Sequence, residues 1–556
     1  MNIGRNLNQF IDLKNEQTNA RFRSYSNVTK NGQSKDYRTP FYRQTLGTIN
    51  QETGKLESPP RQKVLDSWIP QLKALSQEFP GLWEYEMEMA SKVGPLSIQA
   101  PLEKRLDSVH EYWKAITLPS KPISKAALSA VIKEWQGISG LTLRSQMKTV
   151  DKMKLSTASG TPYLGKRRDT LDRTVPCQNY IGEFPNVDLC IGKSISDSKN
   201  WNTAALLGWS GREGGPLAED VKQRVIFMFP FCVNIQELQC YQPLIESAQK
   251  LNLVPAWNSM DAVDQRMTDL FDTKGKQELL ICTDFTKFDQ HFNRDMANAV
   301  QYLLTALLQN NAESRDWIKN VFPIKYYIPL ICGDVFYYGR HGMGSGSGGT
   351  NADETLGHRA LQYEAAQEIR SKLNPNSMCL GDDGVISFPG ISVDLVTEVY
   401  SRHGQVMNPD KQEASDHQAV FLRRWYDSNY RINGICRGVY ATTRAIGRLC
   451  GQERFYDDEI WGPKAVVIRY LSVIENCKYH PLFHKFVDWC IKGDKYRLGI
   501  DIPGFYASIG REANKLIDEI PDFLGYVRSQ QASGSKTAGI ENWEVVKYIR
   551  NNYDCK

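Results

Sequence analysis

Apolar residues in this chain form short continuous runs at some positions and helical repeats at others. Residues 278–283 form a short apolar run that ends at Asp284, which predicts a buried strand with a carboxylate at its tip. From Met296 to Leu307 the apolar residues recur every three or four positions, so a helix is expected next. Two further apolar runs flank the acidic turn at residues 381–384 and predict a β-hairpin over residues 378–388.

The remaining pattern suggests further elements in chain order. A mostly helical pattern covers residues 64–150, and short apolar runs broken by Gly, Pro and Ser cover residues 155–230. A strand at 335–338, a glycine-rich loop at 341–349, a helix from about 352 to 373 and a helix near 393–400 follow. The first 65 residues show little apolar periodicity, which predicts an extended or weakly ordered arm.

Composition and charge refine this picture. The 556 residues are 41% hydrophobic with a net charge of +5, values typical of a globular protein with about three domains or of one large multi-lobed enzyme. Residues 1–65 hold 11 Lys and Arg against 5 Asp and Glu, and six more Lys and Arg lie between 152 and 173. The N-terminal arm is therefore interpreted as a solvated tail, an RNA-contacting arm or a segment that wraps the core.

Several classes of protein are disfavoured. No run of about 18 apolar residues and no signal-peptide pattern is present, so we expect a soluble protein that is not secreted. The 12 cysteines are scattered without a C-x-x-C pair, and the eight histidines show no H-E-x-x-H spacing. This argues against a zinc site or a disulfide framework and favours a reducing compartment.

The turn Gly381-Asp382-Asp383 offers the clearest chemistry. A tight turn favours Asp and Gly for conformational reasons alone, so the triplet by itself is weak evidence. Its apolar flanks, however, would hold two adjacent carboxylates at the edge of a buried sheet, where a cation must offset their repulsion. With Asp284 as the complement from a neighbouring strand, these side chains predict a site for two Mg²⁺ or Mn²⁺ ions.

The glycine-rich loop Gly342–Gly349 has two commoner interpretations. It contains G-x-G-x-x-G, but the acidic residue expected about 20 positions later, Glu368, lies inside a helical run, which disfavours a dinucleotide-binding turn. No Lys-Ser/Thr follows the last glycine, which excludes a Walker loop. With five glycines and two serines in eight positions, the loop is expected to be loosely held and to move about Ser345 and Gly346. The alternative is a static cap on the next helix.

Taken together, these motifs resemble those of viral RNA-dependent RNA polymerases, above all the picobirnavirus and partitivirus-like group of double-stranded RNA viruses. Seven matches occur in the family order G, F, A, B, C, D, E over residues 159–424. They are Ser159-Gly160-Thr161-Pro162-Tyr163, Lys222-Gln223-Arg224-Val225, Asp284-x4-Asp289, Ser345-Gly346-x3-Thr350-Asn351, Gly381-Asp382-Asp383, Asn408-Pro409-Asp410-Lys411 and Phe421-Leu422-Arg423-Arg424.

The resemblance implies an α+β fold shaped as a closed right hand, with a palm built on an antiparallel sheet packed on helices. The expected division is a basic N-terminal arm at 1–65, fingers at 66–270, palm at 271–430 and thumb at 431–556. A fingers insertion is expected near 300–340 within the palm.

The resemblance also implies roles for individual residues. Asp284 and Asp382 would bind two divalent ions with the help of Asp383, and Lys411 would be the general acid, unless it is an ordinary surface lysine. Nucleotide contacts are assigned to Asp289, Lys222, Arg224, Ser345, Gly346, Thr350 and Asn351, and template contacts to Ser159, Gly160 and Pro162. Lys222 and Arg224 are alternatively a solvated basic pair. Many positive-strand relatives carry Asn where this chain has Glu354, so Asp289, Asn351 and Glu354 all remain candidates to read the ribose.

The implied activity is template-directed RNA synthesis from ribonucleoside triphosphates with release of pyrophosphate. Expected partners are template and nascent RNA, nucleotides and a capsid protein, for a monomeric catalytic unit in the virion interior or host cytoplasm. One alternative is a reverse transcriptase, which usually places an aromatic residue at the position of Asp289 and another before the paired Asp. The other is a non-catalytic RNA-binding virion protein, which would leave Asp284 and the acidic hairpin unexplained.

Overall fold

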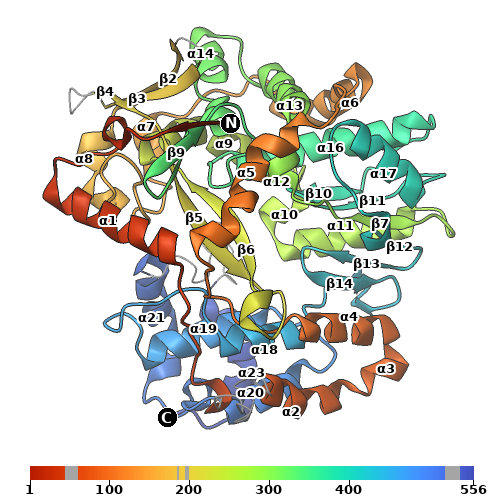
Figure 1. The fold of residues 1–556 in the computed structure, drawn as a ribbon. Helices are drawn as coiled ribbons and strands as arrows, with labels where there is room; N and C mark the ends of the chain where they lie inside the picture. The colour runs from red at the N-terminus through yellow and green to blue at the C-terminus, as the bar shows by residue number, and fades with distance from the viewer. Residues whose placement is uncertain (44–60, 185–186, 195–199, 520–538) are drawn as a thin grey trace, which may run out of the picture.

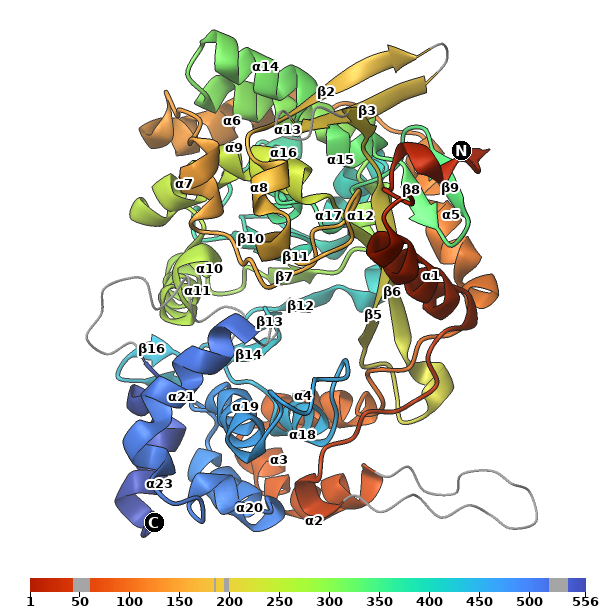
Figure 2. The same ribbon diagram turned by 90° about the vertical axis from the view of Figure 1, so that its left-hand side faces the viewer.

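The computed structural model describes residues 1–43, 61–184, 187–194, 200–519 and 539–556. Figure 1 shows two sheets in the upper part of the molecule and a group of helices below them, with a long hairpin reaching from the upper part toward these helices. The same arrangement is visible from the side in Figure 2. The combination of helices with mostly antiparallel sheets is the α+β fold class that the sequence predicted.

The palm is a four-stranded antiparallel sheet in the order β10-β11-β7-β12. Its strands are Met378–Leu380, Asp383–Ile386, Leu280–Thr283 and Glu413–Ser415. Helices α6 (Lys125–Trp135), α13 (Arg294–Leu307), α16 (Thr350–Glu368) and α17 (Val393–Arg402) share one apolar core with strands β7 and β11. Because the strands are short and this face is covered by helices, the acidic strand ends are held on a rigid base.

A second sheet of five strands, in the order β1-β9-β8-β5-β6, forms the fingers. Its strands are Asn2–Gly4, Val335–Tyr338, Leu330–Cys332, Ala205–Arg212 and Lys222–Met228. The β5–β6 hairpin pairs Leu206 with Met228 and Arg212 with Lys222, so its basic tip lies far from its apolar base. Figure 1 shows this hairpin crossing the middle of the molecule. A separate three-stranded sheet contains β2 (Cys177–Phe184), β3 (Val187–Ser194) and β4 (Asn200–Asn202).

The N-terminal arm is more ordered than its sequence suggested. Residues 2–4 add strand β1 to the fingers sheet, and helix α1 covers Glu16–Asn31. Phe10 and Phe22 are buried in a core with Leu206 and Phe336 from that sheet. Residues 1–43 are therefore not weakly ordered: their few apolar residues pack on distant strands, as the interpretation of a core-wrapping segment predicted, whereas residues 44–60 lie outside the described part.

The same segment then reaches the thumb. Thr39 donates its backbone N–H to Cys450 at 3.0 Å, and Gln452 donates to Tyr37 at 2.9 Å. Phe41 is buried in the thumb core. The N-terminal segment thus connects fingers and thumb, as expected for a closed hand, and Figure 2 shows it running between the two.

The apolar core of the thumb also contains residues from helices that precede the fingers in the sequence. Residues from α2 (Gln62–Leu72) and α4 (Pro80–Ser91) pack with α18 (Thr442–Cys450), α19 (Pro463–Glu475), α20 (Phe483–Gly493), α21 (Phe505–Glu519) and α23 (Glu544–Asn552). Residues 64–93 thus share one apolar core with residues 439–549, and the expected start of the fingers at residue 66 stays a prediction.

Other helices and strands complete the chain. They are α3 (Leu75–Glu78), α5 (Leu106–Lys114), α7 (Gln146–Val150), α8 (Leu171–Thr174), α9 (Phe231–Lys250), α10 (Pro255–Asn258), α11 (Met260–Thr273), α12 (Phe288–His291), α14 (Ala312–Asn320), α15 (Ile324–Tyr327), β13 (Gln418–Phe421), β14 (Arg424–Asp427), β15 (Arg431–Ile432) and β16 (Ile435–Cys436). The helix expected at 352–373 is α16, two residues earlier at its start and five shorter at its end. Within the described ranges, every helix is too short or too polar to cross a bilayer.

Candidate active site

The strands of the palm bring three carboxylates to one edge of the sheet. Asp284 directly follows β7, while Asp382 and Asp383 lie at the turn from β10 to β11. Strand pairing places Gly384 opposite Thr283, so the two acidic strand ends are neighbours. Residues almost 100 positions apart in the sequence therefore meet, as their strand patterns predicted.

The backbone around Asp284 is held by a side chain from outside the strand. Gln412 accepts a hydrogen bond from the Asp284 N–H and donates one to the Asp284 carbonyl, both at 2.9 Å. Its neighbour Lys411, the expected general acid, is exposed at the end of a 3₁₀ turn. Gln412 thus ties the segment carrying Lys411 to the backbone of Asp284.

Crowding and burial shape the acidity of the paired carboxyl groups. Burial, and then the neighbouring Asp382 carboxylate, raise the pKa of Asp383 to about 7. Burial and the Asp289 carboxylate raise the pKa of Asp382 above its usual value. The Leu422 N–H donates to Asp383 Oδ2 at 2.8 Å and partly offsets this effect. Such a cluster of acids needs positive charge to remain ionised at neutral pH.

A second group of polar side chains lies beside the acidic turn. Asp289, 9% exposed, is in α12 and is 3.4 Å from the Arg224 guanidinium of β6. Glu354 of α16 is 5% exposed, and burial together with Asp289 raises the pKa of Glu354 well above its usual value. Burial lowers the pKa of Arg224, but Asp289, Tyr112 and Asp382 together outweigh burial, so the pKa is raised above its usual value. The structure thus brings two of the three ribose candidates, Asp289 and Glu354, together beside Asp382.

Asn351, the third ribose candidate, has a different environment. Its side-chain oxygen accepts a hydrogen bond from Trp257 Nε1 at 2.8 Å. Thr350 directs its hydroxyl to the carbonyl groups of Gly344 and Ser347 at 3.2 and 3.4 Å. Both residues therefore contact protein groups that shape the start of α16 and the loop before it.

The glycine-rich loop is packed more firmly than expected. Residues 342–345 are buried, and Ser345 donates its hydroxyl to the Val225 carbonyl at 2.9 Å. Its own carbonyl accepts the Phe227 N–H at 3.0 Å. Gly346 has a φ of +137°, and a Cβ there would lie 2.0 Å from the Phe227 carbonyl oxygen. The expectation that nothing packs this loop firmly was wrong, because strand β6 hydrogen-bonds its backbone.

The acidic turn is also supported from below by α16. His358 Nδ1 lies 2.9 Å from the Gly381 carbonyl, and Thr355 accepts the Gly381 N–H at 2.9 Å. Gly381 has a φ of +59°, and a Cβ on Gly384 would come within 2.5 Å of the His358 ring. Both glycines are therefore required by geometry, one by its backbone conformation and the other by a close approach.

Basic side chains gather around a cavity whose arginines interact electrostatically with the acidic turn. A cavity of about 200 Å³ lies between the β5–β6 tip, motif E and the thumb. It is lined by Lys92, Arg212, Lys222, Arg423 and Arg444, with Glu213 as the acidic residue. Burial, then the nearby Arg224 and Arg423, lower the pKa of Arg212 to about 10. Lys222 is thus part of a basic cavity, while Arg224 lies deeper, beside Asp289.

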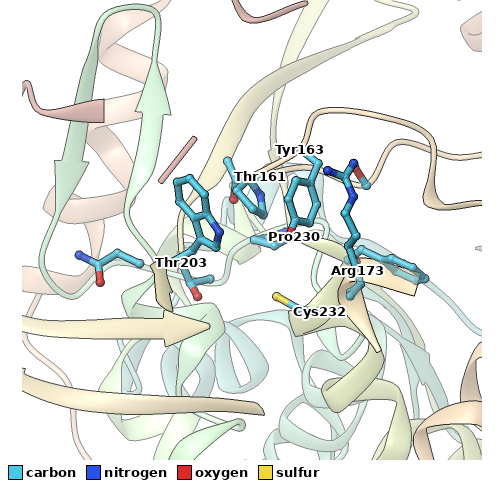
Figure 3. Close-up of a pocket in the computed structure, with 12 residues that line it drawn as sticks. Thr161, Tyr163, Arg173, Thr203, Pro230 and Cys232 are labelled. Atoms are coloured by element: carbon cyan, nitrogen blue, oxygen red, sulfur yellow. The ribbon is translucent and has the colours of Figure 1, made fainter. Parts of the chain in front are cut away.

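The expected template residues are found on the fingers side. Ser159 and Pro162 line a cavity of about 30 Å³ with Tyr163, Arg173 and Phe231, and Gly160 has a φ of +64°. Figure 3 shows Arg173 beside Tyr163, and the guanidinium lies 4.2 Å from the ring centre. This volume holds about one water molecule. The residues therefore form a compact turn, and the cavity is too small for a nucleobase.

Several residues of the site gave no signal in the sequence. Gln412, Arg212 and Tyr112 stand at unremarkable positions in the chain, and only the fold carries them to the site. Tyr112 of α5 accepts the Gly342 N–H on its carbonyl at 2.8 Å. The position of Glu354, four residues after Thr350, did single it out as a ribose candidate.

Comparisons with known proteins agree with this geometry. The family described as viral RNA-dependent RNA polymerase matches residues 130–437. A potential RNA-dependent RNA polymerase of human picobirnavirus (strain Human/Thailand/Hy005102/-) is 50% identical over 540 residues, covering 96% of this chain and 97% of that protein.

Two crystal structures are similar over almost the whole chain. The RNA-dependent RNA polymerase of a human picobirnavirus is 47% identical with a TM-score of 0.89, and its insertion-loop deletion mutant is 46% identical with a TM-score of 0.88. Each comparison covers 99% of this chain and 100% of the other. The alternatives of a reverse transcriptase and a non-catalytic virion protein are not favoured. The chain belongs to the viral RNA-dependent RNA polymerases and catalyses RNA-directed RNA synthesis.

Proposed function

We propose that RNA synthesis occurs at Asp284, Asp382 and Asp383 with two divalent ions, Mg²⁺ or Mn²⁺. The observation that carries this proposal is the meeting of three carboxylates at adjacent strand ends, with raised pKa values for Asp382 and Asp383. Carboxylate oxygens are suitable ligands for both ions. When bound, the ions would lower the pKa of the attacking hydroxyl and offset charge on the leaving group.

Protein side chains alone do not complete such a site. In the part of the chain that the structure describes, no three His, Cys, Asp or Glu side chains converge closely enough to hold a metal. Triphosphate oxygens would supply the further ligands, so occupancy would depend on the nucleotide. In proteins Mg²⁺ is usually bound by one or two carboxylates together with substrate phosphates, which agrees with this arrangement.

The surrounding residues suggest how the substrates are held. The RNA 3′-hydroxyl would release its proton to water as its oxygen bonds to the α-phosphorus, while the bond from that phosphorus to the bridging oxygen breaks and pyrophosphate leaves. Arg224 and Lys222 would bind phosphate, and Asp289 with Glu354 would face the ribose. Ser345, Gly346, Thr350 and Asn351 would shape the nucleotide pocket, and Lys411 would protonate the departing pyrophosphate.

The RNA and its surroundings complete the proposal. Ser159, Gly160 and Pro162, with the basic residues at 152–173, would guide the template by phosphate contacts. We further propose that the polymerase acts as a monomer within the virion interior or the host cytoplasm and contacts a capsid protein.

The test is nucleotide incorporation on an RNA template with Mg²⁺ or Mn²⁺. Asp382→Asn is expected to lower the rate at least ~10³-fold, because each metal-binding carboxylate contributes several kcal/mol to transition-state stabilisation. Asp394→Asn, the same change at an exposed position of α17, is the matched control and should retain activity. Near-normal incorporation by Asp382→Asn would refute the metal assignment.

A further inference from the structure

Two buried side chains of helix α9 lie directly against the glycine-rich loop. Glu237 has no exposed surface, and its carboxylate accepts hydrogen bonds from the Ser347 hydroxyl and, at 3.1 Å, from the Gly348 N–H. Asn234, one turn earlier, is 4% exposed and donates to Glu237 at 3.2 Å and to the Gly346 carbonyl at 3.5 Å. Three successive loop residues are therefore held by two neighbouring side chains.

Burial raises the pKa of Glu237, while the charge of Lys325 and the hydrogen-bond donors around the carboxyl group oppose this rise. The Ser347 hydroxyl, the Gly348 N–H and the Asn234 amide all donate to its two oxygens. Hydrogen bonds to a charged group are stronger than neutral ones, and a buried carboxylate without donors would be costly. Because Gly348 and its neighbours have little conformational preference of their own, the order of this part of the loop depends on such outside contacts.

The side-chain oxygen of Asn234 accepts a hydrogen bond from a residue of the fingers. Arg167 donates through one terminal nitrogen to Asn234 Oδ1 at 2.9 Å, and its guanidinium lies 5.2 Å from the centre of the Phe231 ring. Burial lowers the pKa of Arg167 to about 10. Asn234 thus contacts a side chain of the 154–174 segment on one side and the glycine-rich loop on the other.

Arg167 is also fixed to its own segment. Its N–H donates to the Thr157 carbonyl at 2.9 Å, and one guanidinium nitrogen lies 3.4 Å from the Lys154 carbonyl. Nearby, Ser159 donates its N–H to Gly165 at 2.8 Å and accepts the Phe231 N–H at 2.8 Å. A shift of residues 154–167 would therefore be transmitted to Asn234.

We propose that Glu237, Asn234 and Arg167 are positioning residues that hold Gly346–Gly348 in place and couple this loop to the 154–174 segment. The coupling to template rests on the proposed function, in which that segment guides the template strand. None of the three side chains takes part in the chemical step. They act by keeping the loop that borders the nucleotide pocket in a single arrangement.

The first test uses Glu237→Gln and Ser347→Ala, which weaken the same contact from its two sides. Each is expected to lower kcat for nucleotide incorporation about 10-fold while the Kd for template RNA changes less than twofold. The double variant should be no slower than the slower single variant, because both changes remove one interaction. Glu84→Gln, the same change on the exposed face of α4, should behave as the unaltered protein.

The second test measures coupling by hydrogen exchange, which does not require activity. Arg167→Gln is expected to speed amide exchange at residues 346–348, although residue 167 does not touch the loop. Unchanged exchange there, or additive losses of kcat in the double variant, would overturn the proposal. If the unaltered protein incorporated no nucleotide, the proposed function would fail, and the positioning role would still be decided by exchange. The melting temperature of each variant shows whether a loss of kcat or a change in exchange comes from a failure to fold.

Discussion

Gly346 provides the sharpest test of how the glycine-rich loop is positioned. Its φ of +137° is one that other residues rarely adopt, and a Cβ would lie 2.0 Å from the Phe227 carbonyl oxygen. That oxygen belongs to backbone and cannot move aside without disturbing β6. We therefore expect Gly346→Ala to displace the loop from β6.

The free-energy cost of Gly346→Ala comes either from backbone strain or from lost hydrogen bonds. Forcing a non-glycine residue into this conformation costs about 1–3 kcal/mol. A displaced loop instead loses the hydrogen bonds from Phe227 to Ser345 and from Ser345 to Val225, each worth about 0.5–1.5 kcal/mol. If activity requires the observed arrangement, a loss of 2 kcal/mol or more lowers the rate by roughly 30-fold or more.

Alanine variants at two other glycines serve as controls that distinguish the effect of backbone strain from the effect of a steric collision. Gly140 has a φ of +81° with open space around a Cβ, so Gly140→Ala has the strain without a collision. Gly348 lacks a positive φ, and a Cβ there would meet the movable side chain of Leu238 at 3.0 Å. Both alanine variants should stay within about threefold of normal incorporation. If Gly346→Ala did so too, the observed loop position would not be needed for synthesis.

Three further predictions address other parts of the molecule. Asp289→Ala should weaken discrimination against deoxyribonucleotides by about 1–3 kcal/mol, measured by parallel incorporation assays; a loss in Asn351→Ala instead would move the role to Asn351. Glu86 accepts hydrogen bonds from Thr442, Thr443 and His480 inside the thumb, so Glu86→Gln should lower the melting temperature by about 5 °C, whereas exposed Glu84→Gln should not. The pKa of Asp383, about 7, lies above the ordinary 3.8, so the metal-free protein should lose stability as pH rises from about 4 to 7. Asp383→Asn should therefore melt higher than the unaltered protein at pH 8 in EDTA and equally near pH 4, and an equal melting temperature at pH 8 would contradict the assignment.

Much of the palm could be predicted from local sequence. The apolar run before Asp284 and the two runs around Gly381-Asp382-Asp383 gave strands in the expected places, because alternation and burial are encoded over a few residues. The helical spacing of Met296–Leu307 likewise gave α13. The order of seven motifs predicted the family that the comparisons later established.

Long-range contacts decided what the local pattern could not. Residues 1–43 have few apolar side chains, yet they are ordered because a strand edge and an apolar face of the fingers sheet receive them. Composition predicted a loosely held loop at 342–349, but β6 and α9 hold it through hydrogen bonds with residues more than 100 positions away. The composition of a segment indicates its intrinsic flexibility. It does not indicate which distant backbone groups will form hydrogen bonds with that segment.

The active site shows the same division. The sequence by itself determined the residue types at the strand ends, and so the acidic chemistry. Only the tertiary structure placed Glu354 beside Asp289 and brought Arg212 and Arg423 together at one cavity. The reason is physical: periodicity fixes which side of an element is buried, whereas the neighbours of a buried charge depend on how separate elements pack.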